Sequence, residues 1–431
     1  GSPPRIGEAV FVSGSPDDAD ETAFGNASDN AASGEERSDN KNGSGDNDCS
    51  GEKAEPDGRA ASDGKDASGK SVGAERSGGY VPVSRAETAE YFPAVSVGAH
   101  SAALMCAESG ELLYELSPDE LRPMASTTKI MTALVAIENA SLDTVATVSP
   151  DAVGIIGSSV YLREGEQIKL ESLLYALLLE SANDAATQIA ITVGGDEAGF
   201  VAMMNEKAKQ LGLSHTHFSN PHGLDSEENY STALDLARLT RFALQNPDFA
   251  QLVSTKSVTI GDRVLTNHNK LLWQYSGAIG VKTGYTRTAG RILVGAAERD
   301  GRRLIAVTIA DPNDWADHAA LFDYGFSQFS ERQLVTADSV VGQIPVISAA
   351  EDYVNLISHF SFSYPLAAGE QPELRLLAPH FVFAPCDTVS ATLEVWLDGT
   401  RIGALPLRLA AAVREGGVKK NFLREALMKW L

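Results

Sequence analysis

The stretch PMASTTKIMTAL, residues 123–134, joins a serine and a lysine to the apolar spacing of a buried helix. The run from residue 126 to about residue 139 is expected to be helical, because its large apolar residues fall on one side. Those residues are Ile130, Met131, Leu134 and Ile137. One helical turn separates Ser126 from Lys129, so both side chains lie on the same face. The stretch therefore predicts a serine hydroxyl within reach of a lysine amine at the start of a helix.

Such a pair suits nucleophilic catalysis. A serine hydroxyl is a poor nucleophile unless a base accepts its proton. Lysine can act as that base only when it is neutral, and both burial and a second cation nearby lower the pKa of a lysine. Lys282, which lies in a separate motif, is the candidate second cation. We therefore expect Ser126 to be a nucleophile and Lys129 to be its general base.

Two further motifs carry polar groups that could face a cleft. Ser181 and Asn183 directly follow a leucine-rich run, residues 170–180, that is typical of a buried helix. Both are expected in a loop, from which side chains can turn into a cleft. The motif Lys282-Thr283-Gly284 begins on a predicted strand, residues 280–283, and its glycine lets a substrate backbone approach closely. The lysine and the threonine can then offer a charge and a hydroxyl to a substrate carboxylate.

Strands are predicted on both sides of a helical block. The expected strands are residues 100–106 and 112–116 before it, and residues 264–265, 280–283, 291–297 and 303–309 toward the end. Further helices are expected at residues 196–211 and 232–245. This order favours an α+β catalytic domain at residues 87–329, in which an antiparallel sheet packs against helices.

A different pattern occupies residues 330–417, where short apolar runs alternate with turn residues. The runs are residues 334–341, 353–357, 374–383, 390–397 and 401–409. Asp398-Gly399, between the last two, is a two-residue hairpin signal. We therefore expect a small all-β domain to follow the catalytic domain.

The two ends of the chain differ from both domains. Residues 1–86 are acidic and rich in Gly, Ser and Asp, with few large apolar side chains, so this segment is expected to be disordered. Residues 418–431 return to helical spacing, with apolar residues on one face and a net charge of +3. A helix of fourteen residues is too short to span a bilayer and is expected to lie on the membrane surface. Packing of its apolar face on the β-domain is the alternative.

Charge and composition argue against several other functions. The formal net charge of -23 would repel nucleic acid, so no nucleic-acid partner is expected. His215 and His217 have the alternating spacing of a strand, which could suggest a pair of metal ligands. However, no His-Glu-x-x-His motif or nearby carboxylate accompanies them. We therefore expect neither a metal nor any other cofactor.

The order Ser-x-x-Lys, Ser-x-Asn, Lys-Thr-Gly resembles the penicillin-recognising serine hydrolases. The surrounding sequence is most similar to the low-molecular-mass D-alanyl-D-alanine carboxypeptidases, which are penicillin-binding proteins. The stretches that carry this resemblance are PMASTTKIMTAL at 123–134, ESANDAA at 180–186, FSNPHGL at 218–224, TNHNKLL at 266–272 and VKTGYT at 281–286. The resemblance covers about residue 87 to the end. It implies a β-lactamase/transpeptidase-like catalytic domain, a C-terminal β-domain and often a membrane-associating helix.

The resemblance also implies a mechanism. Ser126 would attack the carbonyl between the two terminal D-alanines of a peptidoglycan stem peptide, with Lys129 as general base. Ser181 would relay the proton to the leaving amine, and Asn183 would hold the substrate amide and Lys129. The substrate would lie along Lys282, Thr283, Gly284 and Tyr285, and the backbone N–H groups of Ser126 and Tyr285 would form the oxyanion hole. β-Lactams would acylate the same serine. Because this substrate is outside the cytoplasm, the enzyme is expected on the outer face of the cytoplasmic membrane.

One segment departs from the family. Some members place an arginine for the terminal carboxylate near residues 311–317, where this chain reads DPNDWAD. Lys282, Thr283 and Arg287 are the expected substitutes. His222 is expected to be structural and not catalytic.

Two alternatives are a β-lactamase of the same fold and a catalytically silent peptidoglycan-binding protein. Against the first, no Glu-x-x-Leu-Asn segment lies between Asn183 and Lys282. Against the second, the Ser126/Lys129 pair is intact.

Overall fold

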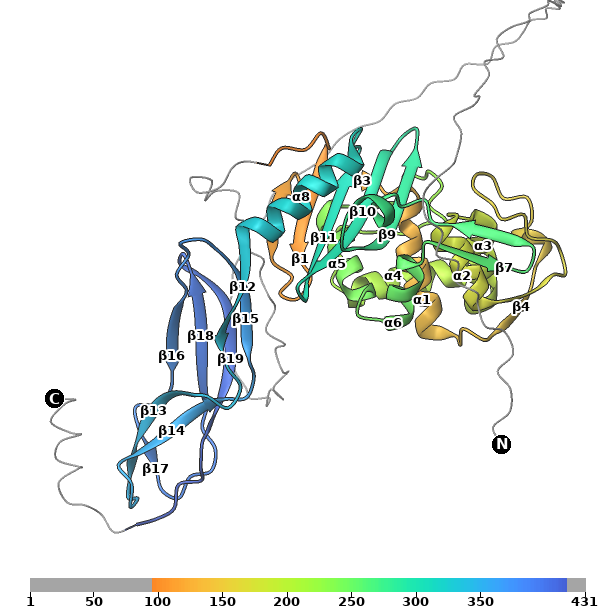
Figure 1. Cartoon of the computed structure of the whole chain (residues 1–431). Helices are drawn as coiled ribbons and strands as arrows, with labels where there is room; N and C mark the ends of the chain where they lie inside the picture. Colours follow the sequence, from red (N-terminus) through yellow and green to blue (C-terminus); the bar gives the residue numbers. More distant parts are fainter. Residues whose placement is uncertain (1–94, 417–431) are drawn as a thin grey trace, which may run out of the picture. The chain divides into compact units, whose positions relative to one another are not determined.

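The computed structural model describes residues 95–416. The predicted acidic segment 1–86 and the predicted surface helix 418–431 lie outside these residues. In the described part of the chain, a sheet with helices packed against it comes first, and a region made of strands follows (Figure 1). No helix in this part is both long and apolar enough to cross a membrane.

A five-stranded antiparallel sheet has the strand order β2-β1-β11-β10-β9. Its strands are β1 (Ser101–Cys106), β2 (Leu112–Leu116), β9 (Ala278–Thr286), β10 (Gly290–Arg299) and β11 (Arg302–Ile309). Alternate side chains of β1 enter two different clusters: Ala103 and Met105 join the core of the helical block, whereas Leu104 and Cys106 pack with Phe322 of α8 (Asp314–Gln328). Because both faces of the sheet are covered, its central strands are continuously apolar instead of alternating.

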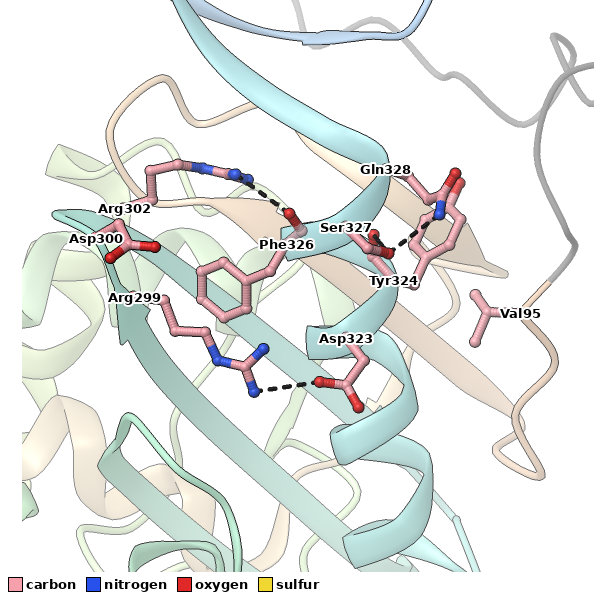
Figure 2. Close-up of a pocket in the computed structure, with 9 residues that line it drawn as sticks. All are labelled: Val95, Arg299, Asp300, Arg302, Asp323, Tyr324, Phe326, Ser327 and Gln328. Carbon is pink, nitrogen blue, oxygen red and sulfur yellow. Dashed lines mark hydrogen bonds and ion pairs between the residues drawn. The ribbon is translucent and has the colours of Figure 1, made fainter.

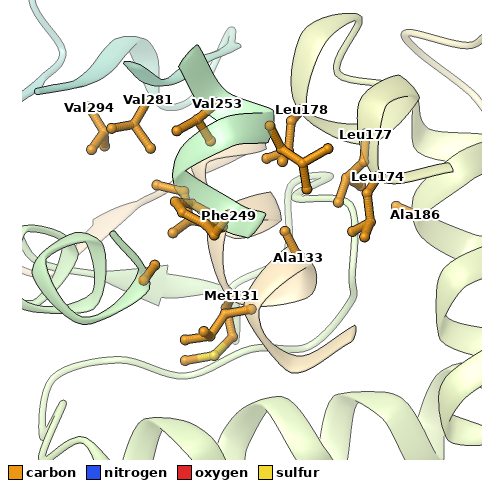
Figure 3. Packing of buried hydrophobic residues seen from close by; sticks show 14 of the residues in the cluster. Met131, Ala133, Leu174, Leu177, Leu178, Ala186, Phe249, Val253, Val281 and Val294 are labelled. Atoms are coloured by element: carbon orange, nitrogen blue, oxygen red, sulfur yellow. The ribbon is translucent and has the colours of Figure 1, made fainter. Parts of the chain in front are cut away.

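The helical block buries one large core (Figure 3). Its helices are α1 (Lys129–Asn139), α2 (Leu170–Leu179), α3 (Asn183–Gly194), α4 (Glu197–Gln210), α5 (Ala233–Ala243), α6 (Pro247–Ser254) and the short α7 (Leu271–Gln274). Leu174 and Leu177 of α2 and Phe249 of α6 pack in this core with Val281 and Val294 of the sheet. This contact joins the helices to the strand that carries the Lys-Thr-Gly motif.

Three short antiparallel pairs complete this part of the structure. They are β3 (Arg122–Pro123) with β6 (Tyr230–Ser231), β4 (Val145–Thr147) with β5 (Gln167–Lys169), and β7 (Ser257–Ile260) with β8 (Arg263–Thr266). The predicted strand at 264–265 is therefore confirmed as part of β8, and its partner β7 was not predicted.

Helices α3, α6, α7 and α8 were also not predicted. The interpretation of residues 181–183 as a loop was wrong at its end, because Asn183 is the first residue of α3. Polar side chains of α3, including Asp184 and Gln188, are buried together with its apolar ones, so the helix lacks an amphipathic pattern. The predicted helix at 126–139 begins instead with a 3₁₀ turn, Ala125–Thr128, and becomes α-helical at Lys129.

The later strands form a six-stranded sheet in the order β16-β18-β19-β14-β13-β17, and β12 pairs with β15. The strands are β12 (Phe329–Val335), β13 (Val340–Ile347), β14 (Tyr353–Ser358), β15 (Phe362–Ala367), β16 (Glu373–Leu377), β17 (Val382–Phe383), β18 (Ala391–Leu397) and β19 (Thr400–Leu409). Asp398 and Gly399 both have positive φ, which is the geometry of the predicted hairpin turn. The predicted single strands at 334–341 and 374–383 were wrong, since each range covers parts of two strands and the residues between them.

Two arginines at the β10–β11 hairpin hold the C-terminal end of α8 (Figure 2). The Arg302 guanidinium donates to the carbonyl oxygens of Gly325, Phe326 and Phe329. These carbonyls belong to the last turn of the helix and the residue after it, where carbonyl oxygens have no N–H donor within the helix. Arg299 pairs with Asp323 at 3.2 Å. The N-terminal end of the same helix, by contrast, lies at the candidate active site.

Candidate active site

The 3₁₀ turn Ala125–Thr128 presents Ser126 at the edge of a cleft. The hydroxyls of Thr127 and Thr128 donate to the carbonyl oxygens of Met124 and Ala125, which stabilises the turn. Gly223 has a φ of +86°, and a Cβ at this position would lie 1.9 Å from the Ala125 carbonyl oxygen. Only glycine permits this approach, so the segment before Gly223 lies directly against the turn that carries Ser126.

Lys129 is completely buried, with 0% of its surface exposed. Its Nζ lies 3.0 Å from Ser126 Oγ and 2.7 Å from Asn183 Oδ1, and it also contacts the His222 carbonyl oxygen. Burial, followed by the positive charge of Lys282, lowers the pKa of Lys129 well below its ordinary value, while Asp184 acts in the opposite direction. The lowered pKa favours the neutral amine, which can accept the Ser126 proton.

Ser181 and Asn183 enter the site at the junction of α2 and α3. Ser181 has a positive φ of 60° and lines the cleft. Besides accepting from Lys129, Asn183 donates through Nδ2 to the Ile156 carbonyl oxygen at 2.7 Å. A Cβ at Gly157 would lie 2.7 Å from this Nδ2, so the loop before β5 packs tightly on the asparagine. The loop therefore fixes the orientation in which Asn183 meets Lys129.

Strand β9 forms the opposite wall. A Cβ at Gly284 would lie 3.3 Å from the Ser126 backbone nitrogen, which shows how closely this strand passes the serine. Thr283 and Tyr285 line the cleft, whereas Lys282 is buried, and burial lowers the pKa of Lys282 to about 7. Lys282 Nζ donates to the Thr283 carbonyl oxygen at 2.9 Å. Residues from all three sequence motifs are thus brought together.

The cleft has a volume of about 380 Å³. Its lining residues are Ser126, Ser158, Ser181, His268, Lys270, Thr283, Gly284, Tyr285, Arg291, Ile292, Asp314 and Trp315. Lys129, Asn183 and Lys282 are buried behind this lining. Arg287, the expected carboxylate partner, is exposed and does not line the cleft, so the structure gives that assignment no support.

Arg291, which was not predicted as a site residue, lines the cleft. No local signal marks it in the sequence: only the strand register, in which Arg291 pairs with Tyr285, places both side chains on one face of neighbouring strands.

His222 occupies a structural position. Its carbonyl oxygen accepts from Lys129, and its ring nitrogen Nδ1 accepts from the Leu224 backbone N–H at 3.2 Å. Burial, together with the charge of Lys129, lowers the pKa of the His222 ring to about 4, so the ring is neutral at neutral pH. The expectation that this histidine is structural is consistent with these contacts.

A serine held against a buried, pKa-lowered lysine, in a cleft between a helical block and the edge strand of an antiparallel sheet, defines a serine hydrolase of the β-lactamase/transpeptidase-like fold. Comparison with known proteins supports the same class. The family model for D-alanyl-D-alanine carboxypeptidases, peptidase family S11, matches residues 86–313.

Individual relatives agree with the family match. The chain is 38% identical to the D-alanyl-D-alanine carboxypeptidase DacB2 of Mycobacterium tuberculosis over 232 residues, covering 51% of this chain and 79% of the relative. It is 31% identical to DacF of Bacillus subtilis over 328 residues, covering 72% of this chain and 81% of the relative. The structure of penicillin-binding protein 5 from Haemophilus influenzae matches with a TM-score of 0.68 and 27% identity, covering 75% of this chain and all of that one.

The chain therefore belongs to the S11 family and is a serine-type D-alanyl-D-alanine carboxypeptidase. The predicted family, the α+β fold class with its all-β region and the predicted activity are confirmed. The comparisons favour neither the β-lactamase nor the silent binder.

Proposed function

We propose that this enzyme removes the terminal D-alanine from peptidoglycan stem peptides through an acyl-enzyme on Ser126. The observation that carries the proposal is the 3.0 Å contact between Ser126 Oγ and Lys129 Nζ, made by an amine that is fully buried and has a lowered pKa. A lysine in this state is a base, and the serine hydroxyl is the group within its reach.

In the acylation step, Lys129 accepts the Ser126 proton as Oγ attacks the carbonyl between the two D-alanines. The backbone N–H groups of Ser126 and Tyr285 stabilise the developing oxyanion. This role is supported by the close approach of Gly284 to the Ser126 backbone nitrogen. Ser181 relays the proton to the leaving amine as the C–N bond breaks and D-alanine departs. Water then attacks the ester and regenerates Ser126.

The remaining residues position the substrate. Asn183 binds the substrate amide on the acyl side and holds Lys129, to which it is hydrogen-bonded at 2.7 Å. Lys282, which is buried behind the cleft lining, contributes a positive charge, the lining residue Thr283 contributes a hydroxyl near the terminal carboxylate, and Gly284 leaves room for the substrate backbone. β-Lactams acylate Ser126 by the same attack. Because their leaving group stays attached, the adduct is long-lived and inhibits the enzyme.

The pH dependence of kcat/KM tests the role of the two lysines. Activity should rise with pH as Lys129 loses its proton, and fall as Lys282 loses its charge above its pKa of about 7. Below that pH, the positive charge of Lys282 lowers the pKa of Lys129. Lys282→Gln removes this charge, so the acidic limb of the profile should move to higher pH. An acidic limb that stays in place or moves to lower pH would contradict the assignment.

The surroundings of the enzyme follow from its substrate. Peptidoglycan lies outside the cytoplasm, and we place the enzyme on the outer face of the cytoplasmic membrane. We divide the chain into an acidic tail (1–86), a catalytic domain (87–329), a β-domain (330–417) and a surface helix (418–431). The amphipathic pattern and net charge of +3 of the last segment support attraction to anionic lipid headgroups.

Co-sedimentation with anionic vesicles tests the anchor. The chain lacking residues 418–431 should lose most of its vesicle binding, because its remaining charge is strongly negative. Deletion should leave D-alanine release unchanged. Equal binding by the full and shortened chains would exclude this segment as the anchor.

A further inference from the structure

Arg291 lies on β10, the strand next to the motif strand β9, and contacts Asp314 and Trp315 at the start of α8. It sits on β10 directly opposite Tyr285 of β9, and Thr283 lies diagonally across the same face. Arg291, Thr283 and Ser126 all line one cleft. A substrate that reaches Ser126 along β9 therefore passes within the region that Arg291 can contact.

An ion pair holds the guanidinium in one orientation. Arg291 Nε lies 3.1 Å from Asp314 Oδ2, and Nη2 lies 2.8 Å from both oxygens of that carboxylate. Asp314 is only 4% exposed, whereas 45% of the Arg291 side chain is exposed. The Trp315 ring centre lies 5.9 Å from the guanidinium carbon and supports it further. Asp314 engages Nε and Nη2, so Nη1 lies outside the pair, and Arg291 is one of the residues that line the cleft.

The enzyme releases free D-alanine, so the peptide that it cleaves ends in a free carboxylate. Two cations at the site, Lys282 and Arg291, could bind this carboxylate. Lys282 is buried, and burial lowers its pKa to about 7, so its charge is lost within the neutral range. Arginine stays charged in proteins and presents a planar set of donors that matches a carboxylate. Asp314 reduces the cost of ordering this side chain before the substrate arrives.

We propose that Arg291 is the specificity-determining residue that binds the terminal carboxylate of the substrate, together with the Thr283 hydroxyl. Asp314 is a positioning residue that orients the guanidinium. This inference rests on the proposed function of the Ser126 site and adds a selectivity to it: the cleft selects peptides with a free C-terminal carboxylate over those whose end is amidated or extended.

Two matched substrates separate carboxylate binding from a structural role. One is a diacyl peptide ending in D-Ala-D-Ala, and the other is the same peptide with a C-terminal carboxamide. The measured quantity is the ratio of kcat/KM for the carboxylate to that for the carboxamide. Arg291→Gln should lower this ratio by about 10- to 100-fold, mainly through a higher KM for the carboxylate substrate. Arg291→Lys keeps a charge beside Asp314 and should give an intermediate ratio.

Arg287→Gln is the matched control, because Arg287 is an exposed arginine on the β9–β10 turn and does not line the cleft. Its ratio should equal that of the wild type. Equal losses on both substrates in the Arg291 variants would show a structural role, and an unchanged ratio would show no carboxylate contact; either result overturns the proposal. Failure of the Ser126 assignment itself is distinguishable, because Arg291→Gln would then still change the ratio while Ser126→Ala kept its activity.

Discussion

Replacing Ser126 with alanine is expected to lower D-alanine release from a diacyl-D-Ala-D-Ala peptide by roughly 10⁴- to 10⁶-fold. Without Oγ no acyl-enzyme can form, and Lys129 has no hydroxyl at 3.0 Å from which to accept a proton. Covalent labelling by a fluorescent penicillin should disappear in parallel. Thermal unfolding should change little, because the side chain borders the cleft and the threonine hydroxyls stabilise the turn.

Ser158 provides a control, since it is another serine that lines the cleft. Ser158→Ala should retain penicillin labelling, because Ser158 is not the serine in contact with Lys129. A folded Ser126→Ala variant that released D-alanine at the wild-type rate would refute the assignment of the nucleophile.

Lys129→Arg is expected to reduce kcat/KM by roughly 10³- to 10⁴-fold, although the substitution keeps a long basic side chain at this position. A guanidinium does not lose its proton in the range where enzymes work, so it cannot accept one from Ser126. Acylation by penicillin should slow by a similar factor, because both reactions begin with the same proton transfer. The acidic limb of the pH profile, which we attribute to Lys129, should also be lost.

The control for this variant is Lys169→Arg. Lys169 is exposed and paired with Asp143 at 2.8 Å, so its substitution should not change the kinetics. Full activity in Lys129→Arg, with the acidic limb in place, would mean that another group is the base.

The parts of the site that could be predicted are those that local rules place. One helical turn separates Ser126 from Lys129, and their contact follows from that spacing. A substrate backbone was expected to approach Gly284 closely, and in the structure the Ser126 backbone nitrogen also lies close to this glycine. The contact between Lys129 and the His222 carbonyl oxygen could not be predicted in this way, because His222 is far from Lys129 in the sequence.

Arg291 was missed for a related reason. Its contact with Asp314 joins β10 to the first turn of α8, and that helix was not predicted. Arg287, the arginine named from the sequence, is closer to the Lys-Thr-Gly motif along the chain, but strand pairing brings Arg291 beside the motif while Arg287 lies in the turn. Strand register decides such positions, and it depends on pairing between segments that the sequence does not specify locally.

The same limit explains the errors in the fold. Helix α3 buries Asp184, whose carboxylate accepts from Ser159 Oγ and the Leu162 backbone N–H, so a polar residue occupies a core position. Periodicity of apolar residues cannot reveal a helix of this kind. In the all-β region, the apolar residues of β12 and β13 were interpreted as one strand, because the turn between them is short.

The central claim is that the reaction passes through an ester on Ser126. Mass spectrometry of the enzyme quenched during turnover of a diacyl-D-Ala-D-Ala peptide tests it most directly. We predict a mass increase equal to the substrate minus one D-alanine, located on the peptide that contains Ser126. An adduct on a different residue would contradict this claim. So would D-alanine release without any adduct, by enzyme that penicillin does not label.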